Sequence, residues 1–215
     1  MTNIAGKAYA MNVVTPSSPR ITWINRLLFM AARGMPERLF GLLGLSLIHF
    51  ARWVIIKPKD WPDLGQGPQK IDNDYMLFCS NFNGTWDQYI DAFSDGIPNG
   101  LNLFWFSATK YPLSIPVTPF KTYITHNQIS TDYYYNATPG AAQRDIKTSL
   151  TTYDALLELE AAHKVQSPAE FARTYKATLA RVQSGFGDVG FGPVASLSTE
   201  RADINRGDYI ADKKA

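Results

Sequence analysis

Residues 77–93 read LFCSNFNGTWDQYIDAF, and they predict a strand, a tight turn and a helix in succession. The beginning of this stretch belongs to a run, Tyr75–Ser80, whose aromatic and apolar content is typical of a strand. A tight turn is expected next, because three residues there tolerate left-handed backbone: Asn81, Asn83 and Gly84. Thr85 and Gln88 then have the spacing of a helix-capping box. The helix that follows has an apolar stripe of Trp86, Tyr89, Ile90 and Phe93.

Similar patterns on either side of this stretch extend the fold. Lys7–Thr15 and Ile48–Ile56 read as strands, and Leu101–Phe106 reads as a fourth strand. A helix is expected from Thr22, with Trp23, Leu27 and Met30 repeating at helical spacing, and a second apolar helix at Glu37–Leu45. The order strand, helix, strand, strand, helix, strand predicts an α+β fold with a ferredoxin-like β-α-β-β-α-β core, an antiparallel sheet and helices on one face.

Further elements follow this core. Tyr111–Phe120 contains three prolines and predicts an irregular loop, whereas Ile129–Asn136 reads as an additional strand. Two C-terminal helices are expected from Thr138 and Ser167, the first with an apolar stripe of Ile146, Leu150, Tyr153 and Leu157. We therefore expect a single domain over residues 1–184 and a Gly-rich polar tail over residues 185–215.

The second face of such a sheet must be covered, because exposed apolar side chains cost free energy. A second copy of the chain would cover it, which predicts a homodimer or a subunit of a larger assembly. The extra strand and the two C-terminal helices offer a monomeric alternative.

Charge is distributed unevenly along the chain. The net charge is only +2, so the composition does not suggest a nucleic-acid partner. Residues 1–60 nevertheless carry eight basic and two acidic side chains: Lys7, Arg20, Arg26, Arg33, Arg38, Arg52, Lys57 and Lys59 against Glu37 and Asp60. This basic and apolar quarter suits an anionic surface or partner, with Arg26, Phe29, Arg33 and Arg38 as candidate surface-binding residues. The alternative is that neighbouring elements of opposite charge balance one another.

Cysteine content and segment lengths point to a cellular location. The single Cys79 excludes an intrachain disulfide, and the N-terminus lacks the pattern of a secretory signal. The longest uncharged run, Leu39–Ala51, is shorter than the roughly 20 residues that a membrane-spanning helix needs. We expect a cytoplasmic protein, with peripheral attachment to the membrane through its basic quarter as the alternative.

Catalytic and metal-binding motifs are weak in this sequence. The three histidines, His49, His126 and His163, are far apart and lack metal-ligand spacing, so no metal site is predicted. Only His126 falls on a segment expected to be a polar loop. The match to G-x-G-x-x-G at Gly185–Gly190 follows a helix rather than a strand and does not predict a dinucleotide site.

Three segments together carry a family resemblance: IHFARWVII (48–56), LFCSNFNGTWDQYIDAF (77–93) and TDYYYNATPGAAQRDI (131–146). They resemble a family of uncharacterised bacterial proteins of actinobacterial type, and more remotely peroxidase-related proteins with a dimeric α+β-barrel fold. The resemblance spans roughly residues 47–147 and places seven residues in the shared segments: His49, Arg52, Asn81, Asn83, Gly84, Trp86 and Asp87. It implies the fold and assigns no role to these residues.

Two functions of different classes follow. The first is a binding or assembly module that docks to a protein partner or an anionic membrane surface through its N-terminal quarter. The second is an oxidoreductase or monooxygenase-like enzyme, haem-dependent or cofactor-free, with haem as the cofactor to test first. Its pocket in the barrel would be lined by His49, Arg52, Trp53, Asn81, Asn83, His126 and Tyr134.

Overall fold

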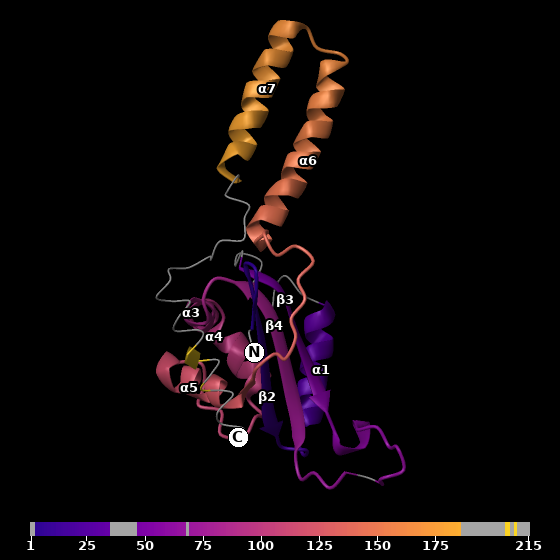
Figure 1. Ribbon diagram of the computed structural model, residues 1–215, viewed down its shortest axis with the longest axis vertical. Helices are drawn as coiled ribbons and strands as arrows, with labels where there is room; N and C mark the ends of the chain where they lie inside the picture. The colour runs from indigo at the N-terminus through magenta and orange to yellow at the C-terminus, as the bar shows by residue number, and fades with distance from the viewer. Residues whose placement is uncertain (1–2, 35–46, 68, 186–204, 207–208, 210–215) are drawn as a thin grey trace.

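The computed structural model describes residues 3–34, 47–67, 69–185, 205–206 and 209 (Figure 1). Its strands are β1 (Ile4–Ala5), β2 (Ala8–Ser17), β3 (Ile48–Ile56), β4 (Asp74–Asn83) and β5 (Gln128–Ile129). Its helices are α1 (Thr22–Gly34), α3 (Trp86–Gly96), α4 (Pro98–Trp105), α5 (Val117–Asn127), α6 (Gln143–His163) and α7 (Pro168–Val182), with short 3₁₀ turns at Pro58–Asp60 and Gln183–Gly185. The predicted α+β class is confirmed.

The strands form one antiparallel sheet in the order β1-β2-β4-β3, with β5 also paired to β2. β4 lies between β2 and β3, and its Phe78 is opposite Val13 on one side and Trp53 on the other. Because β2 and β3 are both antiparallel to β4, they run in the same direction and are joined through α1. The other edge of β2 is shared, since β1 pairs with Tyr9 and Ala8 while β5 pairs with Asn12 and Val13.

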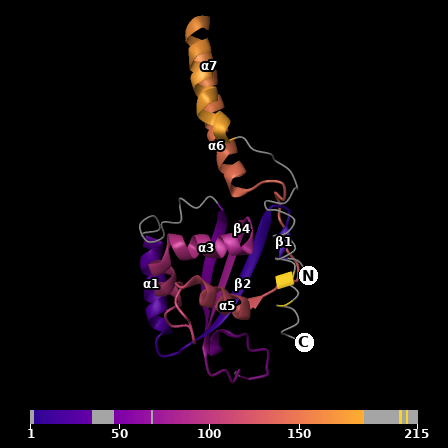
Figure 2. The same ribbon diagram turned by 90° about the vertical axis from the view of Figure 1, so that its left-hand side faces the viewer.

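One face of the sheet carries the hydrophobic core. Alternate residues of β2 and β4 point into it, and they are among the least exposed in the described chain: Tyr9, Met11, Val13, Met76, Phe78 and Phe82. Four helices, α1, α3, α4 and α5, contribute buried side chains to this core, as the sequence predicted for helices on one face. Figure 2 shows α3 and α5 in front of β2 and β4.

Helix α3 forms as the sequence predicts. The Thr85 side chain accepts a hydrogen bond from the backbone N–H of Gln88, and the Gln88 side chain accepts one from the N–H of Thr85. The predicted apolar stripe is buried, with Tyr89 stacked on Phe82 at a ring-centroid distance of 3.8 Å. Capping and burial therefore act together to fix the turn that joins β4 to α3.

Three sequence predictions beyond this helix were wrong. Leu101–Phe106 is not a strand, because Pro98 starts α4 and the side chains of Leu101, Phe104 and Trp105 share its buried side. The predicted loop Tyr111–Phe120 gives way to α5 at Val117, so His126 lies on a helix. The predicted strand Ile129–Asn136 pairs only at β5, because β1 occupies the neighbouring part of the same edge of β2.

After β5, residues 130–142 cross the second face of the sheet and lead into α6. Figure 1 shows α6 and α7 side by side, as a helical hairpin that extends away from the sheet, and in Figure 2 the two helices overlap. The boundary predicted at residue 185 falls where the described residues become sparse and stays a prediction. Arg38 and the helix predicted at Glu37–Leu45 lie outside the described residues. Within the described part of the chain, no helix combines the length and apolarity that crossing a bilayer requires.

Candidate functional site

Several of the predicted pocket residues lie on the second face of the sheet, where they hold the crossing segment 130–142. The side-chain amide of Asn81 donates a 2.5 Å hydrogen bond to the Tyr134 hydroxyl. The amide oxygen of Asn83 accepts a 2.8 Å hydrogen bond from the backbone N–H of Gln143. Burial raises the pKa of Tyr134, and the hydrogen bond from Asn81 offsets part of this effect. These polar side chains therefore position a segment of their own chain.

His49 and Arg52 lie near the edge of the same face. The β3 register shifts between Ile48 and Phe50, which places His49 at an irregularity of the strand. Burial lowers the pKa of His49, and a hydrogen bond with Asn83 counteracts this. Arg52 is exposed and opposite Cys79 in the register. His49 is therefore neutral over a wider pH range than an exposed histidine.

The remaining two predicted pocket residues, Trp53 and His126, lie elsewhere. The Trp53 ring faces the helix-covered side, 4.6 Å from the ring of Phe78 and 5.0 Å from that of Phe104. His126 is on α5, next to β5, whereas His49 is on β3. These strands are at opposite edges of the sheet, three strand spacings or about 14 Å apart. No single pocket therefore contains all the residues that the enzyme hypothesis combined.

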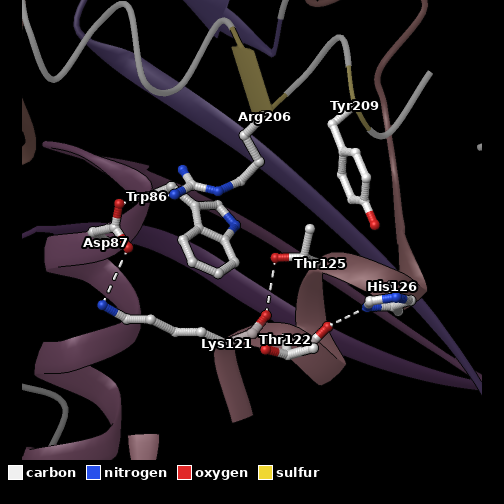
Figure 3. Close-up of a pocket in the computed structure, with 8 residues that line it drawn as sticks. All are labelled: Trp86, Asp87, Lys121, Thr122, Thr125, His126, Arg206 and Tyr209. Atoms are coloured by element: carbon white, nitrogen blue, oxygen red, sulfur yellow. Dashed lines mark hydrogen bonds and ion pairs between the residues drawn. The ribbon is translucent and has the colours of Figure 1, made fainter. Parts of the chain in front are cut away.

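A pocket that the sequence did not predict lies between α3, α5 and the C-terminal residues Arg206 and Tyr209 (Figure 3). Its cavity volume is ≈ 350 Å³, near the lower end of the range for small-ligand sites. Its lining residues are Trp86, Asp87, Lys121, Thr122, Thr125, His126, Arg206 and Tyr209. The Arg206 guanidinium lies over the Trp86 ring, 4.1 Å from its centroid.

Charged groups in this pocket neutralise one another. Lys121 contacts the carboxylates of Asp87 at 3.1 Å and Asp91 at 2.7 Å, and Arg206 donates a 2.8 Å hydrogen bond to Asp87. Burial acts to raise the pKa of Asp87, but Arg206 and Lys121 outweigh it and lower the pKa below its ordinary value. Burial acts to lower the pKa of Lys121, but the two carboxylates outweigh it and raise the pKa.

This arrangement favours binding over catalysis. An amine with a raised pKa stays an ammonium ion near neutral pH and is neither a base nor a nucleophile. The ring of His126 is exposed and hydrogen-bonded to the Thr122 carbonyl at 2.8 Å. The sequence signalled part of this site, since the capping box places Trp86 and Asp87 in the first turn of α3. Nothing in the sequence brings Lys121 or Arg206 to them.

Helix α1 carries an exposed apolar surface. Trp23, Leu27 and Met30 form the strongest apolar repeat of the helix, and such a stripe usually faces the core. Their side chains are instead 57%, 50% and 59% exposed. The buried side contains polar residues instead. Thr22 donates a hydrogen bond to the Asp74 carboxylate, and the Asn25 amide donates one of 2.9 Å to the carbonyl of Phe104.

Among the candidate surface-binding residues that the structure describes, Phe29 packs inward whereas Arg26 and Arg33 are exposed. Phe29 is partly buried and packs against the core, with its ring centroid 5.4 Å from that of Phe104 and 6.2 Å from that of Trp53, so we do not include it in the exposed surface. Arg26 and Arg33 are exposed, and Arg26 is 3.6 Å from the Asp60 carboxylate. We call Trp23, Leu27 and Met30, with Arg26 and Arg33 beside them, the α1 surface.

Comparison with known proteins gives no relative for this site. No protein-family model, curated protein or solved structure matches the chain. Within the described residues, no three His, Cys, Asp or Glu side chains group as a metal site requires. The resemblance to peroxidase-related proteins stays a prediction.

Proposed function

We propose that the protein is a binding module that docks to an anionic membrane surface through the α1 surface. The observation that supports this most directly is the outward direction of the strongest apolar stripe in α1. A surface stripe of Trp, Leu and Met with flanking arginines is the composition of helices that lie in the membrane interface.

The charge of α1 matches an anionic surface. The helix contains Arg26 and Arg33 and no acidic residue, and the exposed Arg20 precedes it. The sequence between α1 and β3 is uncharged from Leu39 to Leu47, which adds apolar residues near the helix in the sequence.

The expected binding is weak and reversible. Burying the exposed half of Trp23, Leu27 and Met30 contributes about 1 kcal/mol each. Each arginine near an anionic leaflet adds about 1 kcal/mol. The resulting total of about 5 kcal/mol corresponds to a dissociation constant somewhat below 1 mM, so a second contact or a higher local concentration would be needed for stable attachment.

Vesicle flotation of the full chain tests this proposal. We expect co-flotation with vesicles containing phosphatidylserine at low salt, weaker co-flotation at high salt, and none with phosphatidylcholine alone. The variant Leu27→Ser should lose most of the binding, whereas Leu64→Ser, a change of a loop leucine that is 87% exposed, should not. Arg33→Glu should weaken binding more than the matched Arg173→Glu on α7. Equal behaviour of Leu27→Ser and Leu64→Ser would refute the assignment to α1, and binding to neither vesicle type would favour a protein partner.

We propose on the same footing that the sheet is a reduced ferredoxin-like arrangement. Support comes from β2 and β3 running parallel on either side of β4, and from β5 on the edge of β2 away from β4, where a fourth strand would pair. The oxidoreductase alternative finds less support, because its candidate residues are divided between the two faces and two edges of this sheet.

A further inference from the structure

Helix α6 carries two stripes of residues at helical spacing. One of them packs against α7, and the other is exposed. The first stripe lies at the contact between the two helices, where Ala155 is buried and Thr148, Thr152, Leu159 and Ala162 are partly buried. From α7, Phe171, Thr174, Thr178 and Val182 are the partly or fully buried residues. Small residues on α6 thus allow the two helices to pack closely.

The second stripe lies on the opposite side of α6. Ile146, Leu150, Tyr153 and Leu157 are spaced by four, three and four residues and are 37%, 62%, 62% and 48% exposed. At 100° per residue this stripe points about 170° away from the α7 contact. The spacing is that of the a and d positions of a coiled coil, which pack against another helix. We call these four residues the α6 seam.

Charges beside the α6 seam are complementary to those of a second copy in an antiparallel orientation. Lys147 and Asp154 are one heptad apart and therefore lie on the same flank of the seam. In an antiparallel pair, Leu150 packs against Tyr153 of the partner subunit, and Ile146 packs against Leu157 of the partner subunit. Lys147 then lies within about 3 Å, measured along the axis, of the level of Asp154 of the partner subunit. The same pairing occurs twice around the two-fold axis.

We propose that two copies of this chain associate through the α6 seam, as an antiparallel pair of α6 helices. In a parallel pair, Lys147 and Asp154 lie on the opposite flank of the seam from Lys147 of the partner subunit and Asp154 of the partner subunit, so this pairing of unlike charges is lost. The α7 helices remain on the outer sides of the pair. This contact is separate from the α1 surface and does not depend on the proposed membrane binding.

Sedimentation velocity of the full chain, over a range of concentrations, tests the association. We expect a dimer of the 24.0 kDa chain at micromolar concentration. Leu150→Ser should raise the dissociation constant at least tenfold. Leu156→Ser is the matched control, because Leu156 is on the same helix and 59% exposed but lies off the seam. A monomeric wild-type chain, or equal effects of the two substitutions, would overturn the proposal.

Charge reversal tests the orientation and leaves the apolar seam unchanged. Lys147→Glu and Asp154→Lys should each weaken the dimer several-fold at low salt, and the double variant should restore it. Circular dichroism checks that every variant keeps its helix content. A dimer that is insensitive to both single reversals, or a double variant weaker than either single one, would overturn the antiparallel arrangement.

Discussion

The side-chain amide of Asn25 donates a 2.9 Å hydrogen bond to the main-chain carbonyl of Phe104, and Asn25 has no exposed surface. This contact joins α1 to the end of α4 and fixes which side of α1 faces the core. Asn25→Ala leaves the carbonyl of Phe104 without this donor and should lower the free energy of unfolding by about 1–3 kcal/mol. Urea denaturation measures the loss. Asn99→Ala, at an exposed position of α4, should change it little.

The crossing segment should lose stability when its hydrogen bond to the sheet is removed. Asn81→Ala and Tyr134→Phe each delete one partner of the 2.5 Å contact. A double-mutant cycle should therefore give a coupling free energy of about 0.5–1.5 kcal/mol. Tyr133→Phe and Tyr135→Phe are controls, because both side chains are largely exposed. Strict additivity of Asn81→Ala and Tyr134→Phe would show that the contact contributes nothing.

Alkaline pH should destabilise the core through its buried tyrosines. Burial raises the pKa of Tyr89 well above its ordinary value, although its hydrogen bond to Ser80 opposes this, and burial likewise raises the pKa of Tyr123 to about 12. The protonated phenols therefore stabilise the fold fully below the unfolded pKa of about 10, and this contribution is lost as the pH rises further. Denaturation between pH 9 and pH 11 should show a shallower decline for Tyr89→Phe than for wild type. Tyr133→Phe should decline as wild type does.

Acid pH should reveal the ion pairs around Asp87. Since the folded pKa of Asp87 is lowered, its contribution is present above the unfolded pKa of about 3.9 and is lost as the pH falls through the folded value. Asp87 is 40% exposed, and such pairs contribute roughly 0.2–1 kcal/mol each. The stability difference between wild type and Asp87→Asn should be constant from pH 5 to pH 8 and shrink below pH 4. Asp95→Asn, exposed on the same helix, serves as the control.

The parts of the fold that the sequence predicted are those where local pattern and tertiary burial agree. The strand Ile48–Ile56 has the predicted bounds, and the capping box of Thr85 and Gln88 begins α3 where expected. The strand predicted at Leu101–Phe106 was wrong because a short apolar run is typical of a buried strand and of a buried helix alike. Only the packing of Leu101, Phe104 and Trp105 against the core distinguishes the helix from the strand.

The candidate sites were less predictable, because each depends on which side of an element faces the core. In α1, the helical spacing of Trp23, Leu27 and Met30 correctly predicted that these residues lie on one side of the helix. It did not predict which side faces the core. The buried hydrogen bonds of Thr22 and Asn25 show that the apolar side faces outward. The α3–α5 pocket brings together Asp87, Lys121 and Arg206, which are far apart in sequence. No spacing rule links such residues, so only the three-dimensional structure reveals their ion pairs.

The ion pair between Lys7 and Asp145, which are 138 positions apart in the sequence, has a consequence for biosynthesis. Lys7 also donates its backbone N–H to the carbonyl of Pro139, so the start of β2 is secured by residues that the ribosome adds much later. At translation rates of about 5–20 residues per second, the N-terminal strand waits roughly 7–28 s for these partners. During that interval the edge of this strand is open to other chains. A nascent-chain chaperone that shields the first 60 residues would therefore raise the yield of native protein.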